Sequence, residues 1–232
     1  MPFFDPNAII LDDRLRAVAD CIPNGACFAD IGCDHGYLSA WLLREKRVSE
    51  CQLCDISAPS LEKAKKLLRA LDLDRNVVFS VGDGAKALVS PVDCAVIAGR
   101  GSSTIMHIIS DGRKALGDAR LILQPNVDAP ELRVFLSQNG YSIVDERIAR
   151  AANRHYVILA AEPGSAHYSP IQLLCGPILL EKGGPLFHSF ASFRIRVAQK
   201  ALKSAQNGNG DRAKELEQEI SLWEEAMKRT SL

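Results

Sequence analysis

Short apolar runs alternate with stretches of helical periodicity through the first half of the chain, and this alternation limits the fold more than any other feature. The apolar runs lie at 26–31, 50–55, 77–81, 92–98 and 120–123, and the helical stretches between them lie at 37–46, 59–71, 85–89 and 103–116. Because a helical stretch follows each of the first four runs, the pattern predicts βαβ units and a parallel sheet.

The next part of the chain has a different order. A helix is expected over 130–139, closed by Gly140, and two apolar runs at 141–148 and 154–161 follow it. The connection between these runs is too short for a helical crossover, so the two strands should pair antiparallel. We therefore predict a doubly wound α/β fold with a seven-stranded sheet whose last strand is antiparallel. This is the layout of class I methyltransferases, and an ordinary dinucleotide-binding fold lacks the final hairpin.

The C-terminal part differs in composition. Residues 163–184 are rich in Gly, Pro, Ser and His and are expected to form a linker. Beyond them, apolar residues recur at helical spacing on both sides of a break at 207–210: Leu186, Phe190, Phe193 and Val197 before it, and Ala213, Leu216, Ile220, Trp223 and Met227 after it. We expect an N-terminal catalytic domain over 1–162, the linker, and an antiparallel helical hairpin over 185–232.

Composition narrows the class of protein. Hydrophobic residues make up 47% of the 232 residues, so the chain can bury a core. Lys and Arg together number 28, as do Asp and Glu, and the global charge therefore argues neither for nor against a nucleic-acid partner. No apolar run approaches the roughly 20 residues of a membrane span, and the N-terminus lacks the layout of a signal peptide. We expect a cytoplasmic protein with no membrane contact.

Seven scattered cysteines are expected to be reduced thiols. Cys51 and Cys54 form a lone C-x-x-C pair, with no second pair or suitably spaced histidines to complete a zinc site. The pair also lies in an expected strand, where alternation would turn the two thiols to opposite faces. We therefore expect no metal.

The most informative motif follows the first strand and reads D-I-G-C-D-H-G, residues 30–36. Glycines here allow backbone to pass close to a ligand. A nicotinamide site would show G-x-G-x-x-G, and the carboxylates of Asp30 and Asp34 beside Gly32 would repel a pyrophosphate. They suit a cofactor with a cationic amine and a sulfonium, as in S-adenosylmethionine. The alternative is a tight turn with incidental acidic residues.

The ends of the other strands carry matching turns. Asp55 ends the second strand, where a carboxylate can accept ribose hydroxyls, and Asp83, next to Gly84, ends the third, where it could bind an adenine amine. The fourth strand ends in Ala98-Gly99, and the fifth in Gln124-Pro125-Asn126, whose amides could hold a base edge. Open α/β sheets bind ligands at these strand ends, although an Asp or Pro there is also common turn chemistry.

Several phrases together resemble one family, the bacterial tRNA adenine-N1 methyltransferases that modify the adenine at tRNA position 22. They are Arg14-Leu15, I-P-N-G-A at 22–26, A-D-I-G-C-D-H-G-Y-L at 29–38, G-D-G at 82–84, L-I-L-Q-P-N at 121–126 and C-G-P at 175–177. The resemblance implies a class I methyltransferase domain with a helical hairpin, S-adenosylmethionine as cofactor and tRNA as substrate. It implies that Asp30, Gly32, Asp34, Asp55, Asp83 and Ala98-Gly99 surround the cofactor, with Arg14 and His35 close by.

The chain also departs from the family pattern. After the fourth strand the family reads A-G-M-G-G, whereas this chain has Arg100 for Met and Ser102 for the last Gly. A cation beside a sulfonium is unfavourable unless it turns outward or meets an anion. The first turn reads D-H-G-Y-L-S here and D-H-A-Y-L-P in the family.

The chemistry that the resemblance implies needs little acid–base help. N1 of adenine has a free lone pair at neutral pH but lies on the pairing edge, so the base must be extruded and then positioned in line. We expect Asn126 and Gln124 to hold the base edge and Tyr37, or less favourably Tyr156, to stack on it. Two alternatives are a methyltransferase for another substrate and a catalytically silent RNA-binding relative.

The first tail helix is basic. It carries Arg194, Arg196, Lys200 and Lys203 without an acidic residue, whereas the second carries Glu215, Glu217, Glu219, Glu224 and Glu225. We expect the four basic residues to bind tRNA. Charge pairing between the two helices is the alternative. The protein is expected to be a monomer.

Overall fold

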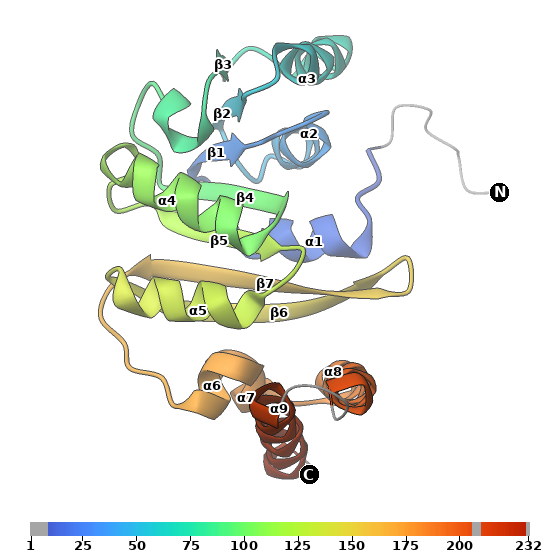
Figure 1. Ribbon diagram of the computed structural model, residues 1–232. Helices are drawn as coiled ribbons and strands as arrows, with labels where there is room; N and C mark the ends of the chain where they lie inside the picture. Colours follow the sequence, from blue (N-terminus) through green and yellow to red (C-terminus); the bar gives the residue numbers. More distant parts are fainter. Residues whose placement is uncertain (1–8, 206–209, 231–232) are drawn as a thin grey trace, which may run out of the picture.

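A seven-stranded sheet runs through the molecule in the order β3-β2-β1-β4-β5-β7-β6 (Figure 1). The computed structural model describes residues 9–205 and 210–230. Strands β1 to β5 are parallel, and β7 pairs antiparallel with both β5 and β6. The predicted sheet with its antiparallel last strand is therefore confirmed. The strands are β1 (Cys27–Ile31), β2 (Glu50–Asp55), β3 (Val77–Val81), β4 (Cys94–Arg100), β5 (Arg120–Pro125), β6 (Tyr141–Ala151) and β7 (Arg154–Pro163).

Helices cover both faces of the sheet. Helices α1 (Asp13–Ala19), α2 (Tyr37–Arg44) and α3 (Ala58–Ala70) pack with one apolar cluster, and α4 (Ser102–Leu116) and α5 (Ala129–Gln138) pack with the other. The expected helix at 85–89 is a short 3₁₀ turn, η1 (Gly84–Ala87). The sheet thus lies between two cores, and the ends of its parallel strands stay open at one edge. No helix in the described ranges is long and apolar enough to cross a membrane.

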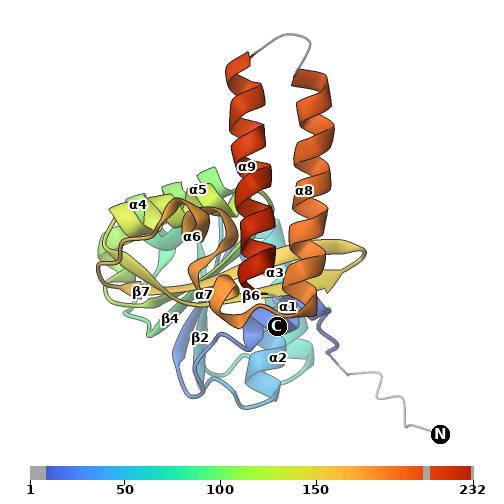
Figure 2. The same ribbon diagram turned by 90° about the horizontal axis from the view of Figure 1, so that it is seen from below.

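The two tail helices, α8 (Pro185–Ala205) and α9 (Gly210–Arg229), stand side by side and project from the sheet domain (Figure 2). They are antiparallel, since His188 near the start of α8 bonds Thr230 just after α9, with 3.0 Å between Nε2 and Oγ1. The expected hairpin is present. The break expected at 207–210 falls on 207–209, outside the described residues, and on Gly210, which begins α9.

The stretch expected to be a linker contains two short helices, α6 (Pro170–Cys175) and α7 (Pro177–Lys182). Pro170 and Pro177 do not break these helices, because each stands in a first turn, where the missing N–H costs no hydrogen bond. Ile171, Cys175 and Leu179 are buried in the same apolar cluster as the sheet. This stretch is therefore packed against the domain.

A buried ion pair joins this stretch to the sheet. Arg133 of α5 donates from Nε to Oε1 of Glu146 of β6 at 2.7 Å, and both side chains are at most 1% exposed. Arg133 also donates to the carbonyls of Leu173 and Leu174, while Glu146 accepts from the backbone N–H of Ile178. These bonds satisfy Glu146 and the Nη1 of Arg133, as a buried pair requires, and leave Arg133 Nη2 without a partner.

Candidate functional site

A pocket of about 640 Å³ lies at the carboxyl ends of β1, β2 and β4. Parallel strands end at the same edge, so the sheet brings together Asp30 of β1, Asp55 of β2 and Gly99 of β4. The expected cofactor residues that line it are Arg14, Asp30, Gly32, Asp34, His35, Asp55, Ala98 and Gly99, together with Tyr37. Nine expected residues thus meet in one cavity, which we call the strand-end pocket.

Asp30 is a buried carboxyl group of this pocket. Its carboxyl is 6% exposed, and Ser39 Oγ donates to its Oδ2 at 2.7 Å. Burial first, then the nearby Asp55 and Asp34, raise the pKa of Asp30 to about 6, and the hydrogen bond from Ser39 opposes the rise. A cationic ligand in the pocket would relieve this crowding of negative charge.

Asp55 orders the backbone around the pocket. Its Oδ2 accepts from the N–H of Asp34 at 3.1 Å, and its Oδ1 accepts from the N–H of Ser57 at 2.8 Å. Asp34 has a φ of 48°, and its own carboxylate, turned outward, lies 2.8 Å from Nδ1 of His35. The His35 ring stacks with Tyr37 at 6.1 Å between centroids, and Tyr37 is 52% exposed. Tyr37 thus stands at the rim as an accessible aromatic face.

Arg100, the departure from the family pattern, lies over the glycine turn of the pocket. A Cβ added at Gly32 would lie 2.9 Å from Arg100 Nη2, and the same Nη2 is 3.9 Å from Asp55 Oδ2. The guanidinium therefore points into the pocket and faces its acids. Ser102, the second departure, turns away, and its hydroxyl donates to the carbonyl of Val127 at 2.6 Å.

Gln124 has a different place from the one expected. It is fully buried, and its Oε1 accepts from Arg14 Nη1 at 2.8 Å and from the N–H of Gly99 at 3.1 Å. Its Nε2 donates to Pro125 O at 2.9 Å and to Asn126 Oδ1 at 3.3 Å. Both amide atoms of Gln124 are thus engaged inside the protein, and its expected contact with a base edge stays a prediction. Asn126 is exposed, and its Nδ2 donates to Gly99 O at 2.8 Å.

Asp83 and Gly84 lie outside the strand-end pocket. Asp83 precedes η1, and a Cβ at Gly84 would lie 3.0 Å from the Ile108 side chain of α4. Gly84 therefore serves a close contact between η1 and α4. Asp83 stays a predicted adenine contact that the pocket lining does not include.

The basic helix divides into two groups. Arg194 Nη2 donates to Glu219 Oε1 of α9 at 2.9 Å, so charge pairing between the helices holds for this residue. Arg196, Lys200 and Lys203 are exposed at the surface of α8.

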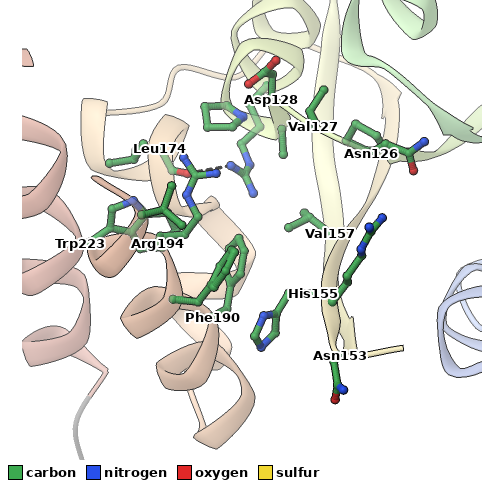
Figure 3. A pocket seen from close by; sticks show the side chains of 17 residues that line it. Asn126, Val127, Asp128, Asn153, His155, Val157, Leu174, Phe190, Arg194 and Trp223 are labelled. Carbon is green, nitrogen blue, oxygen red and sulfur yellow. Dashed lines mark hydrogen bonds between the residues drawn. The ribbon is translucent and has the colours of Figure 1, made fainter. Parts of the chain in front are cut away.

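Sequence reasoning missed a second pocket of about 430 Å³ between the sheet domain and the hairpin (Figure 3). Its walls come from the turn after β5, from β7, and from α8 and α9, with His155, Phe190 and Trp223 among its residues. The aromatic stripe of α8 was the only local signal for it. In the part of the chain that the structure describes, no group of three or more His, Cys, Asp or Glu side chains is placed to hold a metal ion.

Comparison with known proteins agrees with this architecture. A family model described as a methyltransferase domain matches residues 11–159, and the chain belongs to the methyltransferase domain proteins. A tRNA (adenine(22)-N(1))-methyltransferase of Bacillus subtilis (strain 168) is 35% identical over 189 residues, covering 78% of this chain and 79% of that protein. By this match the chain is a member of the tRNA (adenine(22)-N(1))-methyltransferase family.

Solved structures share the whole architecture, tail included. The crystal structure of the B. subtilis M1A22 tRNA methyltransferase has a TM-score of 0.85 and 28% identity, covering 95% of this chain and 100% of that one. The structure of Streptococcus pneumoniae Sp1610 in complex with S-adenosyl-L-methionine has a TM-score of 0.86 and 27% identity, covering 94% of this chain and 100% of that one.

Proposed function

We propose that this protein transfers a methyl group from S-adenosylmethionine to N1 of the adenine at position 22 of tRNA. The observation that carries the proposal is the strand-end pocket, where Asp30, Asp34 and Asp55 converge at the edge at which such sheets bind ligands. Membership of the tRNA (adenine(22)-N(1))-methyltransferase family supplies the substrate and the position.

The residues of the pocket fit this cofactor. S-adenosylmethionine carries a cationic amine and supplies the methyl group from a sulfonium. Asp30 is buried with a raised pKa and gains most from a nearby cation. Asp55 can accept from ribose hydroxyls, and the positive φ of 79° at Gly32 keeps the turn free of a side chain. In this arrangement Arg14, held by Gln124, and Arg100 are the cations available to a carboxylate of the ligand.

The target base needs positioning and not deprotonation, because N1 of a neutral adenine already has its lone pair. We propose that Asn126, exposed beside Gly99, contacts the base edge and that Tyr37 stacks on the base at the rim. Gln124 acts through its neighbours by fixing Arg14 and Gly99. Replacement of Gln124 by Glu keeps the acceptor for Arg14 but loses the Nε2 donor, so it should disturb Asn126 before it disturbs cofactor binding.

Binding of the tRNA backbone is assigned to the exposed cations of α8: Arg196, Lys200 and Lys203. The paired Arg194 contributes chiefly to the hairpin. The division into 1–162, 163–184 and 185–232, a monomeric state and a cytoplasmic location complete the proposal.

The test is transfer of labelled methyl from S-adenosylmethionine to an unmodified tRNA transcript with adenine at position 22, beside a twin with guanine there. Transfer to the adenine transcript alone is expected. Turnover without tRNA would replace the proposal by a different substrate. Cofactor and tRNA binding with no transfer to either transcript would show a silent RNA-binding relative.

A further inference from the structure

We propose that the second pocket, between the sheet domain and the hairpin, receives an extruded nucleobase of the tRNA other than the methylated adenine. We call it the hairpin pocket. This proposal rests on the proposed function for the identity of the ligand, since a tRNA must bind near the strand-end pocket. Its own evidence is independent and lies in unpaired donors, aromatic faces and charge.

Unpaired hydrogen-bond donors gather in the hairpin pocket. In the described chain five buried side-chain polar atoms have no hydrogen-bond partner, and three of them belong to residues that line this pocket: Arg133 Nη2, Arg194 Nε and Trp223 Nε1. The Arg133 and Trp223 side chains are each 1% exposed. A buried donor without a partner is costly. Arg133 Nη2 lies beside Gly176, which does not line the pocket, so Arg194 Nε and Trp223 Nε1 are the two donors in the pocket wall that lack an acceptor. The ligand should therefore present carbonyl or ring-nitrogen acceptors, as the edge of a nucleobase does.

Aromatic side chains provide the faces that a planar ligand needs. His155 of β7 lies 5.6 Å from Phe190 and 5.7 Å from Phe193 between ring centroids, and Phe190 meets Trp223 at 5.5 Å (Figure 3). Phe193 is 42% exposed, and the neighbouring Val197 is 46% exposed. Exposed aromatic rings at a pocket mouth are the platforms on which extruded bases stack. The volume of about 430 Å³ lies in the range of small-ligand pockets.

Charge around the pocket favours a nucleic acid. In the lining, Arg133 pairs with Glu146 and Arg194 pairs with Glu219, which leaves Arg154 as the further cation beside a single acidic residue, Asp128. Beyond the lining, Arg150 and Arg196 are close enough to act on His155, whose pKa is lowered mainly by burial and further by these two cations. The ring of His155 is thus neutral at pH 7 and suited to stacking, while the surrounding cations attract a phosphate backbone.

The base in this pocket is distinct from the methyl acceptor. The residues that line the hairpin pocket and those that line the strand-end pocket have no member in common. The two linings join at Asn126, whose Nδ2 donates to Gly99 O and whose backbone N–H donates to Arg100 O, each at 2.8 Å. A methyl acceptor must lie about 3–3.5 Å from the donor, and acidic residues expected around the cofactor line the strand-end pocket, whereas none of them lines the hairpin pocket. We therefore assign the hairpin pocket to another nucleotide of the same tRNA.

The experiment is a double-mutant cycle that combines the Phe193→Ala substitution in the protein with single abasic sites in the tRNA. Dissociation constants are measured for wild-type and variant protein with transcripts that lack one base at a time. Loss of a stacked base weakens binding by about 5- to 100-fold, so Phe193→Ala should do so with the intact transcript. One abasic position other than 22 should weaken wild-type binding to a similar extent and should weaken the variant no further, because both changes remove the same contact.

Leu186→Ala is the matched control, since Leu186 is a 38% exposed apolar residue on the same helix but lines a different surface. It should leave the dissociation constant unchanged, and thermal unfolding checks that both variants fold. Additive losses at every abasic position would overturn the proposal, and so would non-additivity at position 22 alone. Methyl transfer by the wild type is measured on the same intact transcript. If Phe193→Ala and one abasic position other than 22 are non-additive but no methyl is transferred, the proposed function is refuted and the base-binding role of the hairpin pocket is not. If methyl is transferred but the losses are additive at every position, the role of the hairpin pocket alone is refuted.

Discussion

Replacing Arg100 by Met should shift the ratio of the dissociation constants of S-adenosylmethionine and S-adenosylhomocysteine in favour of S-adenosylmethionine. The guanidinium points over Gly32 into the strand-end pocket, 3.9 Å from Asp55, so the cofactor must share the pocket with a positive charge. The two ligands differ by the methyl group and its sulfonium charge. The ratio of their dissociation constants therefore isolates the electrostatic repulsion from the steric and hydrogen-bonding effects of the substitution.

The magnitude follows from Coulomb's law. The Arg100 side chain is 41% exposed, so the effective dielectric lies well above that of a dry interior. For charges about 6–8 Å apart and an effective dielectric of about 40–80, the repulsion is roughly 0.5–1.4 kcal/mol. Removal of the charge should then shift the ratio of the two dissociation constants by about 2- to 10-fold in favour of S-adenosylmethionine.

Isothermal titration with both ligands measures this ratio, and Arg100→Lys is the control that keeps the charge. The lysine variant should give the wild-type ratio, while both variants lose the planar fork that can meet Asp55. An unchanged ratio in Arg100→Met would refute the reasoning, because Arg100 would then already be neutralised by Asp55 or by a carboxylate of the ligand.

Three further predictions concern charge in the fold. Asp30→Asn should raise the free energy of unfolding of the apoprotein by up to about 3 kcal/mol at pH 8, at about 1.4 kcal/mol per pKa unit. In denaturant unfolding this gain should become smaller below pH 6, where native Asp30 is protonated. An equal gain at pH 4 would contradict the prediction. Wild-type cofactor affinity, followed by titration across the same range, should fall as the pH drops below about 6, since protonated Asp30 no longer attracts a cation. Glu146→Gln should cost about 3–5 kcal/mol in denaturant unfolding because it leaves Arg133 charged and buried, whereas the exposed pair of Arg212 and Glu215 serves as control and its loss should cost less than about 1 kcal/mol.

The basic helix gives a prediction in the same series of measurements: Arg196→Ala should reduce the slope of log affinity for tRNA against log salt by about one, and Arg194→Ala should chiefly lower the melting temperature. Equal effects of the two substitutions on the slope would contradict the division of the helix into paired and free cations.

The fold can be predicted from the sequence because the hydrophobic periodicity of each segment indicates whether it forms a helix or a strand. Strands β1, β2 and β5 are buried on both faces and therefore appear as short apolar runs. The turns with Asp30 and Asp55 are readable for the same reason, since they directly follow those runs. The sequence therefore predicts the position of the strand-end pocket, because the parallel order of the strands brings Asp30, Asp55 and Gly99 together.

The sequence does not predict the roles of residues that depend on contacts between side chains of different elements. From the sequence, Gln124 is expected to be an exposed amide at a strand end. In the structure Arg14 of α1 lies across the strand ends and donates a hydrogen bond to Oε1 of Gln124. The direction of Arg100 depends on the acidic residues of other strands. The lining of the hairpin pocket comes from β5, α5, β7, α6, α8 and α9, of which α8 carries an aromatic pattern. Such contacts are set by tertiary packing, for which a single sequence has no periodic signal.

The buried pair of Arg133 and Glu146 explains how the hairpin can take part in recognition at a distance from the strand-end pocket. Glu146 binds the N–H of Ile178, and Gly176, with a φ of 102°, stands where a Cβ would lie 2.6 Å from Glu146 Oε2. The C-G-P phrase at 175–177 is therefore required for the close approach of α6 and α7 to the sheet. Because this joint is buried and bonded on its Glu146 side, α6 and α7 are held against the sheet domain and fix the place where α8 begins. The tRNA contact proposed for α8 would then have a fixed position relative to the strand-end pocket.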